Sequence, residues 1–220
     1  MAVLLFANGD MPDHDGLSWV QPFLAQASLI VAADGGVRFV RQLGRLPDVV
    51  VGDMDSMPAS WQQELNAAQV QIVHYPAAKD ETDLELALLY AAAHSDIAEP
   101  LLVFAALGGR LDQTLANILL LAHPALVGRS VRLVEPFQQA WLVRQETVIH
   151  GQVGDKVSLI PLGGAVEVAH TSGLAWSLHH DTLAFGPARG VSNVMEASLV
   201  TIRLTQGQAL CVHTQREWQR

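Results

Sequence analysis

Short, continuous apolar runs alternate with segments of helical pattern through the first half of the chain. The runs are expected strands, at residues 3–7, 29–33, 49–51, 71–74 and 101–106. The helix candidates are residues 18–26, 37–43, 59–68, 82–94 and 112–122. Strands that are apolar on both faces and separated by helices are typical of a parallel sheet covered on both sides. The pattern predicts an α/β domain of the Rossmann-like kind.

The pattern changes near Glu135 and Pro136. Beyond this point the chain offers short strands between Gly, Pro and Asp turns, at residues 140–144, 157–161, 166–169, 182–185, 192–195, 199–204 and 208–213. Strands every ~8–12 residues without a helical pattern are typical of a β-sandwich or barrel. We therefore expect two domains, residues 1–135 and 136–220.

Composition limits the classes of partner. Thirteen Lys and Arg against 22 Asp and Glu give a net charge of −9, which argues against nucleic-acid or anionic-membrane binding through a basic face. The longest apolar run, residues 101–107, is far shorter than the ~20 residues that span a bilayer. Residues 1–30 show no signal-peptide pattern, and a lone cysteine, Cys211, excludes an internal disulfide. We expect a cytoplasmic protein.

A polar motif follows each predicted strand of the first domain. The motifs are Asn8-Gly9-Asp10, Asp34-Gly35-Gly36, Gly52-Asp53-Met54-Asp55-Ser56, Lys79-Asp80-Glu81-Thr82-Asp83 and Gly108-Gly109-Arg110-Leu111-Asp112. Parallel strands place their carboxyl ends at one edge of the sheet, where ligands bind. Carboxylates packed together are costly unless a cation joins them, and Mg²⁺ prefers such oxygen ligands. The sequence thus predicts a magnesium site beside two cations, Lys79 and Arg110.

Two of these motifs carry the expected metal ligands. Asp53 and Asp55 are one residue apart, so both carboxylates can reach one ion; a turn whose aspartates cap the next helix is the alternative. The T-x-x-E pattern from Thr82 predicts a helix start. Asp83 then lies in the first turn, where its carboxylate can project into the crevice. Lys79, in the same loop, suits a phosphate group.

The glycine pairs Gly35-Gly36 and Gly108-Gly109 permit close backbone approach before a helix, where amides can meet phosphate. A tight turn between strand and helix requires the same residues, so each pair alone is weak evidence. The sequence contains neither a P-loop motif nor a G-x-G-x-x-G motif after a strand. These common nucleotide sites are therefore not expected.

In their order and spacing, the motifs resemble those of thiamin pyrophosphokinases. The resemblance rests on Ala33–Gly36, Gly52–Ser56, Lys79–Leu84, Gly108–Asp112, Thr171–Trp176 and Gly190–Asn193. One departure is visible: the family usually has His after the aspartate of the G-x-R-x-D motif, where this chain has Gln113. That difference leaves Asp112 in place but puts a role for the neighbouring ring in doubt.

The resemblance implies an α/β domain that binds ATP and Mg²⁺ and a β-sandwich that helps to bind thiamin. It also implies a homodimer with sites between subunits. The implied metal ligands are Asp53, Asp55 and Asp83, which with Lys79 and Arg110 form the implied catalytic set. The implied ATP site comprises Asp34, Gly35, Gly36, Lys79, Gly109, Arg110 and Asp112. The implied thiamin site comprises Thr82, Asp83, Ser192, Asn193 and Trp176, with Trp176 reaching the partner subunit's site.

The implied reaction moves the pyrophosphoryl group of ATP to the thiamin hydroxyl and releases AMP. Asp83 or Asp53 is a candidate acceptor for the hydroxyl proton, but a metal ligand is a weak base, so this role stays open. A pyrophosphokinase for a pterin alcohol would keep the aspartates without needing Trp176. A non-catalytic sensor of thiamin or nucleotide would lose the metal ligands, all of which are present here.

Overall fold

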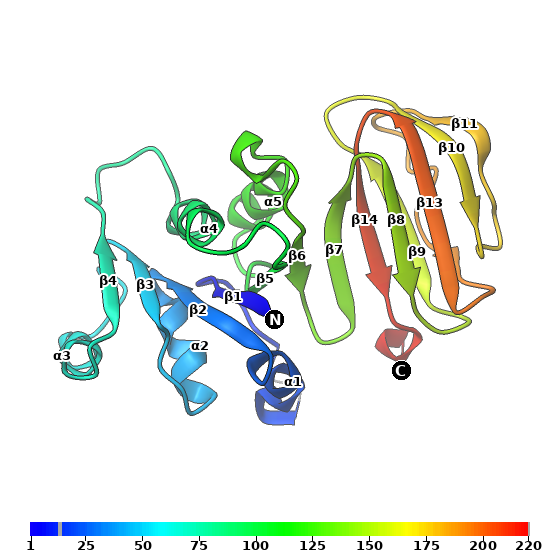
Figure 1. Cartoon of the computed structure of the whole chain (residues 1–220). Helices are drawn as coiled ribbons and strands as arrows, with labels where there is room; N and C mark the ends of the chain where they lie inside the picture. Colours follow the sequence, from blue (N-terminus) through cyan, green and yellow to red (C-terminus); the bar gives the residue numbers. More distant parts are fainter. Residues whose placement is uncertain (13–14, 220) are drawn as a thin grey trace. The chain divides into compact units, whose positions relative to one another are not determined.

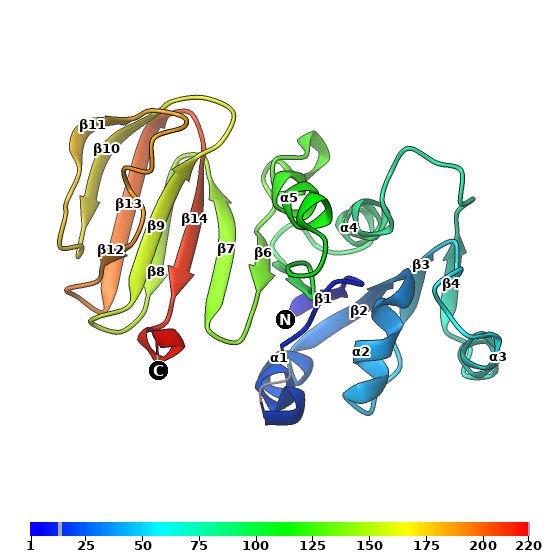
Figure 2. The same cartoon turned by 180° about the vertical axis from the view of Figure 1, so that it is seen from behind.

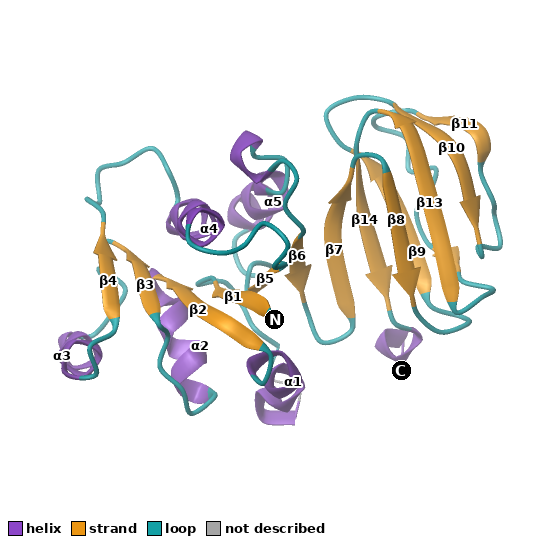
Figure 3. Cartoon of the chain, in the orientation of Figure 1, coloured by secondary structure: helices purple, strands orange, loops and turns teal. Residues whose placement is uncertain are grey.

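The computed structural model describes residues 1–12 and 15–219 and divides into two compact units, Met1–Pro136 and Phe137–Arg220 (Figure 1). Each unit has its own layers of secondary structure, coloured by type in Figure 3. The predicted fold class, α/β followed by all-β, is confirmed.

The sheet of the first unit is parallel, with its strands in the order β6-β5-β1-β2-β3-β4. The strands are β1 (Ala2–Phe6), β2 (Ala27–Ala33), β3 (Val49–Gly52), β4 (Gln71–His74), β5 (Leu101–Phe104) and β6 (Val131–Val134). Strand β6 was not predicted, because Arg132 interrupts its apolar run. The central strands are buried along their length, as continuous apolar runs require.

Helices cover both faces of this sheet. They are α1 (Gln21–Leu24), α2 (Val37–Gln42), α3 (Ala59–Ala67), α4 (Asp83–Ala93) and α5 (Leu111–Leu120), with short 3-10 turns at Asp15–Val20, Asp34–Gly36 and Pro124–Leu126. Helices α4 and α5 lie on one face, and α1 and α2 lie on the other (Figures 1 and 2). Among the described residues, none of the helices has the length and apolar character needed to cross a membrane.

The expected helix at 18–26 is confirmed only in part. The segment contains a 3-10 turn and the single helical turn of α1, and strand β2 already begins at Ala27. Leu17 has a left-handed φ of 65°, and the amide of Ala2 donates to the carbonyl of Gln26. Pairing with β1 therefore takes the end of the segment into the sheet.

Helix α4 is fixed at both ends, which matters because its first residue is Asp83. At the N-terminus, Oγ1 of Thr82 accepts a hydrogen bond from the Glu85 amide at 3.2 Å, so the predicted capping is confirmed. At the C-terminus, the guanidinium of Arg129 donates to the Ser95 carbonyl at 3.0 Å and also to the carbonyl of Ala92. A cation on these free carbonyls stabilises the helix end.

The second unit contains two antiparallel layers, β12-β9-β14-β7 and β11-β10-β13-β8. The strands are β7 (Gln138–Val143), β8 (Glu146–His150), β9 (Lys156–Pro161), β10 (Val166–Ser172), β11 (His179–Leu183), β12 (Asn193–Val194), β13 (Leu199–Gln206) and β14 (Ala209–Thr214). Leu159 and Cys211 from one layer share a buried cluster with Val168 and Ile202 from the other. The predicted β-sandwich is confirmed, and Cys211 fills its core as expected.

Candidate active site

A cleft of about 470 Å³ lies in the first unit, where the parallel strands end. Its walls come from all five polar motifs, which are far apart in the sequence. The lining includes Asn8, Gly9, Asp10, Asp34, Asp53, Ser56, Lys79, Glu81, Thr82, Asp83, Gly108, Gly109, Arg110, Gln113 and Asn117. The expectation that the motifs meet at one edge of the sheet is therefore confirmed.

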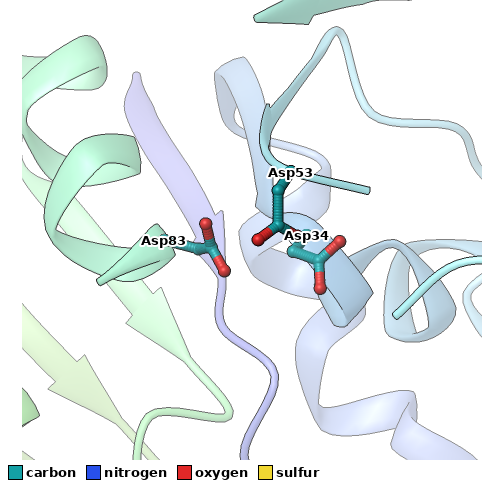
Figure 4. A group of neighbouring side chains, drawn as sticks. All are labelled: Asp34, Asp53 and Asp83. Carbon is teal, nitrogen blue, oxygen red and sulfur yellow. The ribbon is translucent and has the colours of Figure 1, made fainter. Parts of the chain in front are cut away.

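Three carboxylates form the floor of this cleft, which we call the acidic cluster: Asp34, Asp53 and Asp83. Each offers one oxygen, and these oxygens all lie within 4.8 Å of one another. Asp34 follows β2, Asp53 follows β3, and Asp83 opens α4. Figure 4 shows Asp83 facing the other two carboxylates across a gap. Three like charges this close favour a bound cation.

Asp34 is the most constrained member of the acidic cluster. Asp34 is only 2% exposed and has a left-handed φ of 41°. Its Oδ1 accepts no hydrogen bond. Burial raises the pKa of Asp34 above its ordinary value, and the charges of Asp83 and Asp53 add to this; hydrogen bonds from Ser56 and Gly35 oppose it. A buried, unpaired carboxylate oxygen is costly, so the chemistry of this atom suits a cation ligand.

The structure does not bring Asp55 into the acidic cluster. Oδ1 of Asp53 accepts a hydrogen bond from the Asp55 amide at 3.1 Å, and this bond holds the pKa of Asp53 below its ordinary value. The Asp55 carboxylate itself is exposed and accepts from Ser56 Oγ at 3.1 Å. Met54, between the two aspartates, is buried with a left-handed φ of 65°. Asp55 therefore lies beside Asp53 but outside the group of three carboxylates whose oxygens lie within 4.8 Å of one another.

Lys79 lies against the acidic cluster. Its Nζ is 2.8 Å from Asp83 Oδ1 and 3.7 Å from Asp53 Oδ2, and its side chain is only 10% exposed. The contact with Asp83 is an ion pair without good hydrogen-bond geometry, since Asp83 Oδ1 accepts no hydrogen bond. Burial acts to lower the pKa of Lys79, but the two carboxylates outweigh it and the pKa is raised. The ammonium is therefore charged.

Gly52 makes the close approach of the acidic cluster possible. A Cβ at this position would lie 2.9 Å from the Cβ of Asp34 and 3.1 Å from Oδ1 of Asp83, and its φ is 151°. Any larger residue would fill the space between these carboxylates. A glycine cradle, carboxylate oxygens and an unpaired buried oxygen together suit a hard divalent cation such as Mg²⁺.

Arg110 and Asp112 pair with each other at the surface. The guanidinium donates through Nε to Oδ1 at 3.1 Å and through Nη2 to Oδ2 at 2.5 Å. The bonds from Arg110 lower the pKa of Asp112, and both side chains are mostly exposed. Arg110 and Gln113 line the cleft, whereas Asp112 is outside its lining. Asp112 thus orients Arg110 at the cleft edge.

The two glycine pairs differ in role. Gly35 and Gly36 are buried and lie behind the cleft lining. A Cβ on Gly36 would lie 2.0 Å from the carbonyl oxygen of Phe6, so this glycine lets α2 pack against the end of β1. Gly108 and Gly109 line the cleft with left-handed φ values of 82° and 66°. Only the second pair presents its backbone to the cleft.

Two residues of this region escaped the sequence argument. Asn117 is buried in the cleft wall, and its Nδ2 donates to the carbonyl of Ala106 at 2.7 Å. Asn117 lies four residues after Gln113 on a predicted helix, and this spacing could have indicated that the two side chains share a face. Glu135 directly follows β6, and burial, with the charge of Asp10, raises its pKa to about 7. Because β6 was missed, the polar residue at its end was missed too.

The predicted thiamin residues of the second unit lie on and below a surface loop. Trp176, between β10 and β11, is 65% exposed, which agrees with a loop position. Asn193 is buried, and its amide binds the backbone of Trp176: Oδ1 accepts from N at 3.1 Å, and Nδ2 donates to O at 2.7 Å. Ser192 is exposed with a φ of 60°. Asn193 therefore holds the loop that presents the indole.

Comparisons with known proteins give a consistent result. Residues 20–133 match the family model described as thiamin pyrophosphokinase, catalytic domain, and residues 145–208 match the one described as thiamin pyrophosphokinase, vitamin B1 binding domain. Thiamine pyrophosphokinase 3 of Oryza sativa subsp. japonica is 31% identical over 166 residues, which are 71% of this chain. The chain spans only 62% of the length of that relative.

Bacterial relatives match over more of their length. Thiamine pyrophosphokinase of Bacillus subtilis (strain 168) is 25% identical over 190 residues, covering 85% of this chain and 87% of the relative. A crystal structure of thiamine pyrophosphokinase from Bacillus subtilis superposes with a TM-score of 0.83 at 22% identity. It covers 97% of this chain and 99% of the solved one. At this identity the superposition supports the fold.

Proposed function

This chain belongs to the thiamin pyrophosphokinase family, and we propose that it transfers the pyrophosphoryl group of ATP to the hydroxyl of thiamin, giving thiamin diphosphate and AMP. The observation that carries this proposal is the cleft in which the acidic cluster meets Lys79 and Arg110. The pterin-alcohol and sensor alternatives are not favoured, because both family models describe thiamin pyrophosphokinase domains.

The acidic cluster is the proposed site of Mg²⁺. The sequence predicts Asp53 and Asp83 as ligands, and both carboxylates belong to the acidic cluster. Asp34 supplies the third nearby carboxylate. Asp55 stays a predicted ligand, but its carboxylate would have to move to join this group. A divalent ion there would neutralise charge on the phosphate oxygens.

The residues of the cleft have separate roles in the proposed reaction. Lys79 and Arg110 bind and orient the phosphates, and the exposed backbone at Gly109 leaves room for them. The thiamin hydroxyl oxygen forms a bond to the β-phosphorus while the bond from that phosphorus to the oxygen bridging the α-phosphate breaks. AMP leaves with that oxygen, and the hydroxyl proton passes to a carboxylate of the acidic cluster, Asp83 or Asp53, or to water. Thr82 holds the start of α4, and thereby the carboxylate of Asp83, in place.

The second unit is the proposed thiamin-binding and dimerisation domain. Thiamin carries a positive thiazolium ring, and an aromatic face attracts a desolvated cation. Trp176 offers such a face, with Asn193 holding its backbone and Ser192 beside it. In the proposed homodimer the sites lie between subunits, and Trp176 reaches the site of the partner. The protein would act in the cytoplasm, where ATP is available.

A dimer would also cover an apolar stripe on α5. Leu111, Leu115 and Leu119 recur at helical spacing and are 73%, 52% and 55% exposed. Sedimentation at micromolar concentration is expected to give a dimer, and Leu115→Glu, on the first unit, to weaken the dimer formed through the second unit. Ile97→Glu, a matched change at a site 63% exposed, should leave the dimer intact. A fully active monomer would contradict the proposal.

The direct test of the function is an assay with ATP, Mg²⁺ and thiamin. AMP and thiamin diphosphate are expected in equal amounts, because one transfer makes one of each. Omitting thiamin or adding a chelator should abolish AMP formation. If AMP appears only with a pterin alcohol, or with no acceptor, the proposed substrate is wrong.

A further inference from the structure

Lys79 shares its carboxylate partner with the proposed metal site. Its Nζ lies 2.8 Å from Asp83 Oδ1, one of the two oxygens that Asp83 can offer to a cation, and 3.7 Å from Asp53 Oδ2. An ammonium at this position and a divalent ion on the same carboxylates would repel each other at short range. The two cations therefore compete for these carboxylates.

The ammonium is an incomplete partner for the acidic cluster. It carries one positive charge against three carboxylates, and Asp34 Oδ1 remains buried without a hydrogen bond. A lysine head group is a compact point charge on a flexible stem, so it can leave its partners without unfolding its surroundings. A divalent ion brings more charge to the same oxygens.

The segment that carries Lys79 is an exposed loop that can move. It joins β4 to α4 as the long loop in Figures 1 and 3, residues 75–82. Its tip, residues 76–78, is exposed, as are Asp80 and Glu81. Few backbone hydrogen bonds are described for this loop: Tyr75 N donates to Gly52 O, Lys79 N donates to Ala77 O, and Thr82 O accepts from Leu86 N. Exposed loops with few such bonds have low local stability.

We propose that Lys79 is an internal counterion of the acidic cluster, which it holds together until the metal ion arrives. Entry of the metal then displaces the ammonium from Asp83, and the freed lysine becomes available to the nucleotide phosphates. The proposal rests on the proposed function of this cleft. It gives Lys79 two successive positions in one catalytic cycle, with the loop 75–82 as the hinge.

The test is the affinity for Mn²⁺ alone, measured by calorimetric titration without nucleotide. Lys79→Met removes the competing charge and is expected to bind Mn²⁺ about tenfold more tightly than the natural protein. The control is Lys156→Met, the same change at the only other lysine of the chain, in β9 of the second unit. Its Mn²⁺ affinity should be unchanged.

Melting temperatures separate this effect from misfolding. Lys79→Met should melt below the natural protein without metal, because the carboxylates lose their counterion, and Mn²⁺ should raise its melting temperature by more. Unchanged or weaker Mn²⁺ binding by Lys79→Met overturns the counterion proposal. Should Lys79→Met fail to fold, Lys79→Gln takes its place in both measurements.

Asp83→Asn separates this proposal from the proposed function. If Asp83→Asn weakens Mn²⁺ binding but Lys79→Met does not strengthen it, the metal site stands and the counterion role fails. If Asp83→Asn binds Mn²⁺ as well as the natural protein does, the metal site itself is wrong. Absence of Mn²⁺ binding in every protein overturns both.

Discussion

Replacing Asp83 with asparagine is expected to lower turnover by about a hundredfold or more. Mutation of a residue that only supports a metal ligand already lowers activity or metal affinity by up to about a hundredfold, and Asp83 is itself a proposed ligand. The change keeps the shape of the side chain but removes a negative charge from the acidic cluster. Asparagine can also retain the start of α4, since the cap is supplied by Thr82. The rate of AMP formation at limiting Mg²⁺ measures the effect.

A matched control is Glu64→Gln, which makes the same carboxylate-to-amide change on the exposed side of α3. Glu64 pairs there with Arg41, and a surface pair contributes little. Its activity should equal that of the natural protein. Near-normal turnover of Asp83→Asn at limiting Mg²⁺ would remove Asp83 from the metal site.

Replacing Trp176 with alanine is expected to raise the KM for thiamin several-fold to about thirtyfold, the range that a cation–aromatic contact provides. The KM for ATP should hardly change. Because Trp176 is 65% exposed, the melting temperature should also change little, whereas truncation of a buried tryptophan costs ~3–5 kcal/mol. Steady-state kinetics with each substrate varied in turn provide the measurement.

Phe185→Ala is the control for Trp176. Phe185 is 63% exposed in the same unit and has no proposed contact with substrate. It removes a similar aromatic surface, so its thiamin KM should match that of the natural protein. Equal effects of the two variants would mean that Trp176 has no specific role. A large fall in melting temperature for Trp176→Ala alone would assign it to packing.

The layers of the fold and the edge of the sheet at which the cleft lies could be predicted from the sequence. Continuous apolar runs identify strands buried on both faces, and parallel strands bring their carboxyl ends together. The motifs Asp34–Gly36, Asp53–Ser56 and Lys79–Asp83 could therefore be predicted to meet. Residues from all three line one cleft. The cap at Thr82 was predictable for the same reason: its signal is local.

Which carboxylates come together could not be predicted in this way, because it depends on the packing of distant segments. Asp53 and Asp55 share a loop, but the group of three close carboxylates contains Asp34, from the end of another strand, with Asp53 and Asp83, and does not contain Asp55. The sequence pattern cannot reveal this, because Asp34 reaches Asp53 through the pairing of β2 with β3, which are distant in the sequence. Strand β6 was hidden for a related reason: Arg132 breaks its apolar run, and its pairing with β5 depends on a segment that is distant in the sequence. Spacing limits which residues can be neighbours; the packing of distant segments decides which oxygen faces which.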